Sequence, residues 1–135
     1  MVPRLSDFEG LWLVSRVIRP KDTPEGRFEG QARFTRDGAS LRYFEEGELT
    51  LPGSGPMHAE RAYLWRRGGK GIIVDFADGR AFHSFDPAAP EATHWCDPDD
   101  YAVRYKFDRW PEWRAEWRVK GPRKDYVMVP DSRRA

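Results

Sequence analysis

The chain has 135 residues and a net charge of +1, with 23 basic and 22 acidic residues distributed along its length. This length is typical of one domain, residues 1–135, with a sizeable core, and the balance of charge argues against a nucleic-acid-binding surface. No apolar window reaches the roughly 20 residues that span a bilayer, and the N-terminus lacks a secretory signal, so we expect a cytoplasmic protein without a membrane partner.

Alternation of apolar and charged residues with a period of two recurs along the chain, as in WRAEWRVK at 113–120, and no segment has a helical period longer than two turns. Asp78-Gly79 is a signal for a two-residue hairpin. In chain order, we expect strands at about 10–19, 27–35, 40–50, 58–67, 71–77, 80–86, 92–97, 100–109, 112–120 and 123–129. Short strands with hairpin connections and no crossover helix predict an all-β fold, a single up-and-down antiparallel β-barrel of about ten strands.

Alternate residues of a barrel strand face the lumen, so the strand register predicts the chemistry of the interior. Three charged residues, Arg16, Glu45 and Arg61, share this face with apolar and aromatic residues. Two guanidiniums against one carboxylate leave surplus positive charge, and arginine binds carboxylate or phosphate through a bidentate fork. The sequence therefore predicts a small, partly apolar anionic ligand. Two other interpretations remain open: Arg16 or Arg61 pairs with Glu45, or a one-residue bulge turns these side chains outward.

Two histidines, His83 and His94, lie on strands that we expect to be neighbours. An imidazole can act as an acid/base group or as a metal or haem ligand, but the spacing of histidines and cysteine matches no zinc motif. One alternative function is therefore an isomerase or hydrolase in which either histidine acts with Tyr101 or Glu45; the other interpretation is a hydrogen-bonded core histidine. The single cysteine, Cys96, excludes an intramolecular disulfide, fits a reducing compartment and is interpreted as a small buried thiol.

A set of motifs covers nearly the whole chain: Phe8-Glu9-Gly10-Leu11-Trp12, Tyr43-x-Glu45-x-Gly47, Arg61-x-Tyr63-x-Trp65, Phe76-x-Asp78-Gly79-Arg80-x-Phe82-His83, His94-x-Cys96-x-x-Asp99-x-Tyr101 and Gly121-Pro122-Arg123-Lys124-Asp125-Tyr126. It resembles the motif set of a bacterial domain-of-unknown-function family with a lipocalin-like (calycin) β-barrel. The resemblance implies the fold and no established activity. With the inward-facing positions, it gives the expected ligand-binding residues: Arg16, Tyr43, Glu45, Arg61, Tyr63, Trp65, His83, His94, Tyr101 and Tyr126.

The lipocalin-like resemblance also implies how one end of the barrel closes. The tryptophan of Gly10-Leu11-Trp12 would plug that end, and a basic residue of the last strand, Arg123 or Lys124, would lie across its ring. More distantly, the strand plan is similar to nitrobindin-type haem barrels and fatty-acid-binding proteins, so haem binding is a further alternative. The cofactor, the identity of the ligand and the oligomeric state, a homodimer included, stay open.

Overall fold

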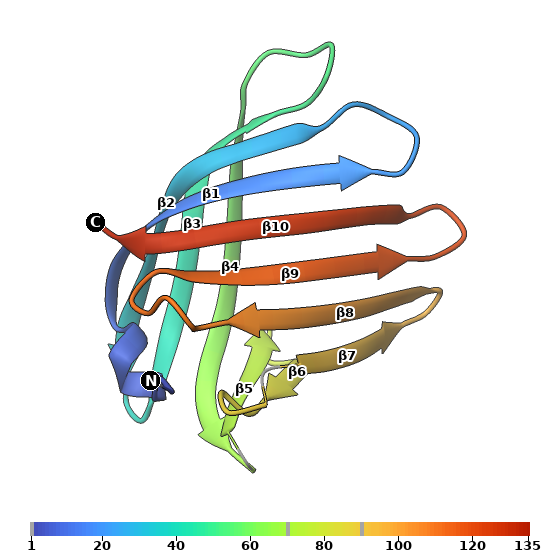
Figure 1. Cartoon of the computed structure of the whole chain (residues 1–135). Coiled ribbons are helices and arrows are strands. Elements are labelled where there is room, and N and C mark those ends of the chain that lie inside the picture. The colour runs from blue at the N-terminus through green and yellow to red at the C-terminus, as the bar shows by residue number, and fades with distance from the viewer. Residues whose placement is uncertain (1, 70, 90) are drawn as a thin grey trace.

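The computed structural model describes residues 2–69, 71–89 and 91–135, and its sheet of ten antiparallel strands wraps into a nearly closed barrel (Figure 1). A short 3-10 helix, η1 (Leu5–Phe8), precedes the strands. The strands are β1 (Gly10–Pro20), β2 (Gly26–Asp37), β3 (Ser40–Thr50), β4 (Met57–Gly68), β5 (Gly71–Phe76), β6 (Ala81–Phe85), β7 (Glu91–Cys96), β8 (Asp99–Lys106), β9 (Trp113–Lys120) and β10 (Asp125–Arg134). Each expected strand is present, so the predicted all-β, lipocalin-like, up-and-down fold is confirmed.

The order of strands in the sheet is β6-β5-β4-β3-β2-β1-β10-β9-β8-β7, so β1 and β10 pair and the two edges are β6 and β7. These edges lie next to each other, and the rings of Phe82 and His94 pack across the seam with centroids 5.3 Å apart. Cys96 is the last residue of edge strand β7, and its thiol is exposed. The prediction that this thiol is buried is therefore wrong.

Aromatic side chains fill the end of the barrel next to η1. Phe8 and Trp12 are fully buried, and the indole Nε1 of Trp12 donates a hydrogen bond to the Phe8 carbonyl oxygen at 2.8 Å. The rings of Trp110 and Trp113 lie 4.9 Å and 5.4 Å from the ring of Phe8, centroid to centroid. Trp12 thus plugs this end, as the resemblance implied.

The basic residue over Trp12 is Arg134, and neither Arg123 nor Lys124 takes this place. The Arg134 guanidinium carbon lies 3.9 Å from the centroid of the Trp12 ring, and its Nη1 donates to the Glu9 carbonyl oxygen at 2.8 Å. The expectation failed because β10 continues to Arg134 instead of ending near residue 129, and the register of β1 and β10 pairs Arg134 with Trp12.

The opposite end of the barrel is its mouth. The turns after β1, β7 and β9 lie together there, at the right of Figure 1, while η1 lies at the left. Among the described residues, no helix is both long enough and apolar enough to cross a bilayer.

A β-bulge adds a second inward-facing residue to β6, next to His83. The register between β5 and β6 shifts between Val74 and Asp75, so that Phe82 and His83 are both buried although they are consecutive. His83 faces the lumen because it pairs directly with Val74, and the bulge turns Phe82 to the same side.

Candidate functional site

A cavity of about 60 Å³ lies in the lumen, above the aromatic plug. Most of the predicted ligand-binding residues line it: Arg16, Tyr43, Glu45, Arg61, Tyr63, Trp65 and His83. The strand register brings them together because each occupies an inward-facing position on β1, β3, β4 or β6. The cavity is thus lined mainly by aromatic rings, with charged groups at a few points.

A buried ion pair in the cavity wall joins β1 to β3 across the intervening strand β2. The Arg16 Nη2 donates to Glu45 Oε1 at 2.6 Å, and the Tyr43 hydroxyl donates to the same oxygen at 2.6 Å. The Glu45 side chain is only 1% exposed. Burial alone would lower the pKa of Arg16, but the hydrogen bond and the charge of Glu45 raise it above its ordinary value. Burial and the neighbouring Glu45 raise the pKa of Tyr43 well above its ordinary value, so its hydroxyl stays protonated.

Arg16 reaches Glu45 across β2 because two glycines on β2 and β3 leave space on the inner surface of the sheet. Gly30 and Gly47 are paired directly on β2 and β3, and neither has a side chain to fill the lumen. The ring of Phe28 covers both: a Cβ added to either glycine would lie 2.8 Å from its Cζ. The guanidinium carbon of Arg16 lies 4.8 Å from the Phe28 ring centroid. The Phe28 ring thus packs on the two glycines, and the Arg16 guanidinium packs on the Phe28 ring. This packing orients Arg16 toward Glu45.

Arg61 has a different environment. It lies directly opposite Glu45 in the register of β3 and β4, yet its Nη2 points across the lumen to the sulfur of Met128, 3.9 Å away. Among the described residues, no carboxylate forms an ion pair with this half-buried guanidinium. Of the two predicted pairings for Glu45, the structure shows the one with Arg16, and Arg61 carries the surplus positive charge.

His83 forms the second polar pair of the wall. Its Nε2 lies 2.9 Å from the hydroxyl of Tyr105, and the ring packs against Phe82 and Trp117. Burial, together with the charge of His94, lowers the pKa of His83 to about 4, so the imidazole is neutral at pH 7. Burial raises the pKa of Tyr105. An imidazole therefore reaches the lumen, but its partner is Tyr105, not Tyr101 or Glu45 as expected.

The remaining predicted site residues, His94, Tyr101 and Tyr126, are not on the cavity wall. His94 pairs with Tyr101 between β7 and β8, next to the turn at the mouth, and Tyr126 lies at the start of β10. Lys124 donates a hydrogen bond to the Tyr101 hydroxyl at 3.3 Å and forms an ion pair with Asp99 at 3.2 Å. These groups lie near the mouth, on the side of the barrel formed by β7, β8 and β10.

The prediction omitted some residues of the cavity wall: Val14, Val74, Phe82, Tyr105, Trp113, Ala115, Trp117, Pro130 and Ser132. Tyr105 could have been predicted from the sequence, because it alternates in phase with Tyr101. Ser132 lies beyond the expected end of the last strand, and Phe82 shares the lumen with His83 only because of the bulge.

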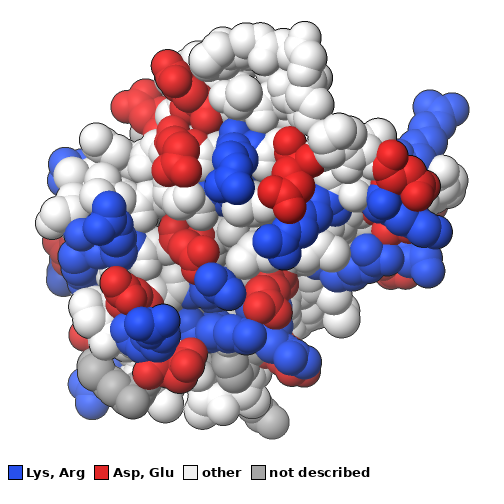
Figure 2. Space-filling view, turned by 45° about the horizontal axis from the view of Figure 1, so that its top comes forward, with Lys and Arg blue, Asp and Glu red and all other residues white. Residues whose placement is uncertain are grey.

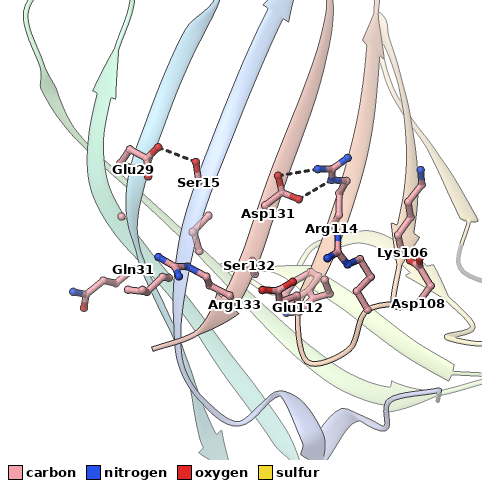
Figure 3. Close-up of a pocket in the computed structure, with 15 residues that line it drawn as sticks. Ser15, Glu29, Gln31, Lys106, Asp108, Glu112, Arg114, Asp131, Ser132 and Arg133 are labelled. Atoms are coloured by element: carbon pink, nitrogen blue, oxygen red, sulfur yellow. Dashed lines mark hydrogen bonds and ion pairs between the residues drawn. The ribbon is translucent and has the colours of Figure 1, made fainter.

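A larger groove, of about 760 Å³, runs along the outside of the barrel (Figure 3). Acidic and basic residues line it in equal number, and two pairs of its polar groups are bonded to each other: Ser15 donates to Glu29 at 2.8 Å, and Arg114 holds Asp131 through contacts of 2.6 Å and 3.2 Å. Acidic and basic side chains are interspersed over the face seen in Figure 2. This groove presents matched charges to solvent, whereas the lumen holds an unmatched one, so we assign the candidate site to the lumen.

Comparison with known proteins gives a family and a fold. A family model described as "Family of unknown function (DUF6314)" matches residues 8–134. No curated protein matches the chain. The structure of the S-type phycobiliprotein lyase CPES from Guillardia theta is similar, with a TM-score of 0.66 over 95% of this chain and 87% of that chain. The two sequences are 11% identical, so this likeness shows the fold alone.

Proposed function

The chain belongs to DUF6314, a family of unknown function, and we propose that this barrel binds a small carboxylic acid in its lumen. The observation that carries the proposal is Arg61. Its guanidinium is half-buried, lines the cavity and has no carboxylate partner in the described part of the chain. Buried charges in proteins are normally paired, so a carboxylate on the ligand would complete this site.

The size and lining of the cavity restrict the ligand. Cavities that hold drug-sized ligands have volumes of about 300–1,000 Å³, and the lumen cavity has about 60 Å³. The proposed ligand is therefore a short acid whose apolar part contacts the rings of Tyr63 and Trp65. A haem group would need a lumen several times larger, so the geometry favours the acid over the haem alternative.

The neutral state of His83 supports binding rather than acid/base catalysis. A general base works best with a pKa near the working pH, and burial holds the pKa of His83 at about 4. The nearby hydroxyl of Tyr105 stays protonated because burial raises its pKa. At pH 7 this pair therefore offers hydrogen bonds to a ligand and takes up no proton. We also propose a cytoplasmic location for this binding protein, because a chain with a single cysteine forms no intramolecular disulfide and suits a reducing compartment.

Titration calorimetry with short acids and amides tests the proposal. We expect butanoate to bind the wild type and butanamide to bind at least about tenfold more weakly, because a charge-assisted bond to Arg61 is lost. Arg61→Gln should weaken butanoate binding by a similar factor. The matched control is Arg33→Gln, an exposed position on the outer face of β2, which should leave the affinity unchanged.

Two results would contradict the acid-binding function. One is equal affinity for butanoate and butanamide, and the other is an Arg61→Gln variant that binds butanoate as the wild type does. A bilin belongs among the probes, because the structural neighbour is a phycobiliprotein lyase. Binding of the bilin but of no short acid would overturn the small ligand proposed for this lumen.

A further inference from the structure

The cavity wall contains buried polar atoms that have no hydrogen-bond partner among the described residues. One is an acceptor, Glu45 Oε2, and three are N–H donors: the Nε of Arg16 and the indole Nε1 of Trp65 and Trp113. The fifth, His83 Nδ1, donates or accepts according to the tautomer of the ring. All these residues line the same cavity. Buried polar atoms in native proteins nearly always have a partner, and an indole nitrogen can only donate. The groups that complete this wall must therefore include both a donor and acceptors.

We propose that the bound acid is a short hydroxy acid, whose carboxylate pairs with Arg61 and whose hydroxyl donates a hydrogen bond to Glu45 Oε2. This inference rests on the proposed function, because it assigns chemistry to the acid of the same site. The oxygen atoms of the ligand accept from the unpartnered N–H groups of the wall. One molecule of this class thus supplies both kinds of partner.

The small cavity limits the distance between the carboxylate and the hydroxyl of the ligand. Glu45 and Arg61 are directly opposite each other, and directly opposite residues have Cβ atoms about 4.5–5.5 Å apart. Both side chains line the cavity of about 60 Å³. The two polar groups of the ligand must therefore be close together, which points to a hydroxyl on the carbon next to the carboxylate or one carbon further.

The charge of the lumen favours a hydroxyl over an amine as the donor. Arg16 already neutralises Glu45 at 2.6 Å, and Tyr43 donates to the same oxygen. With a hydroxy acid bound, the guanidiniums of Arg16 and Arg61 face two carboxylates, one from Glu45 and one from the ligand. An ammonium group would add a positive charge to a buried site, where unpaired charge is costly. Amino acids should therefore bind more weakly than hydroxy acids.

The test compares acids that differ by one group, on the unmodified protein. We expect lactate to bind at least about tenfold more tightly than propanoate, and 3-hydroxybutanoate or 2-hydroxybutanoate to exceed butanoate by a similar factor, because a hydrogen bond to a buried carboxylate is gained. Alanine should bind no more tightly than propanoate. In Glu45→Gln, checked for folding by circular dichroism, the preference for the hydroxyl should shrink.

The possible outcomes distinguish the hydroxy-acid inference from the acid-binding function on which it rests. If propanoate and butanoate bind as tightly as their hydroxylated counterparts and Arg61→Gln abolishes the binding, the hydroxyl inference is overturned and the acid-binding function stands. If no acid binds, or if binding does not depend on Arg61, both are overturned. Because the main comparison uses wild-type protein, a folding defect in the Glu45 variant does not affect it.

Discussion

Glu45→Ala is expected to lower the free energy of unfolding by about 3–5 kcal/mol, the range for breaking a buried ion pair by removing one partner. The cost arises because Arg16, 6% exposed, keeps its charge without a carboxylate, and because the buried Tyr43 hydroxyl loses its acceptor. Chemical denaturation with urea, followed by tryptophan fluorescence, measures the change.

Two controls identify the cause of that loss. Glu46→Ala, at the next and exposed position of β3, should change the unfolding free energy by less than about 0.5 kcal/mol. The double variant Arg16→Met with Glu45→Leu removes both charges and should be more stable than Glu45→Ala, because only the lost acceptor of the Tyr43 hydroxyl still lowers its stability. A loss in Glu45→Ala as small as that in Glu46→Ala would contradict the buried pair.

Acidification is expected to cost about 3 kcal/mol of stability through His83 alone. Its pKa is lowered from 6.5 to about 4 by burial and by the charge of His94, so the unfolded chain binds a proton that the folded barrel does not. The stabilising contribution is present above pH 6.5 and is lost as the pH falls toward 4, at about 1.4 kcal/mol per pH unit. Urea denaturation repeated between pH 7 and pH 4 measures this slope, and His83→Gln should remove it.

His58 provides the matched control. It is exposed on β4, and its hydrogen bond to Glu60 at 2.8 Å raises its pKa, so it contributes stability that is present below its unfolded pKa and is lost as the pH rises. The sign is therefore opposite to that of His83, and His58→Gln should leave the acid-induced loss in place. A loss that persists in His83→Gln would show that another group causes it.

Much of the fold and part of the lumen follow from the alternation of residues. A period of two is set by backbone geometry, so the same pattern that locates the strands also assigns their faces. Arg16, Glu45 and Arg61 were placed in the lumen for this reason, and the structure has all three on the cavity wall. Tyr43, Tyr63 and Trp65 follow from the same alternation.

The details that alternation does not contain were missed or left open. Alternation does not predict whether Arg16 or Arg61 pairs with Glu45. The pairing depends on Gly30, which leaves space for the Arg16 side chain to cross β2. The bulge after Val74 depends on local backbone geometry and adds Phe82 to the lumen beside His83. The length of the last strand decides that Arg134 lies over the plug, and nothing in residues 130–134 resembles a periodic apolar pattern. The volume of the cavity depends on how the aromatic rings pack together.

The most direct test of acid binding in the lumen is a crystal structure of the wild-type protein grown with 3-hydroxybutanoate. We expect density for one molecule in the lumen cavity, with its carboxylate on the Arg61 guanidinium and its hydroxyl within hydrogen-bond distance of Glu45 Oε2. Density confined to the outer groove beside Arg114 and Asp131, with only water in the lumen, would contradict the account.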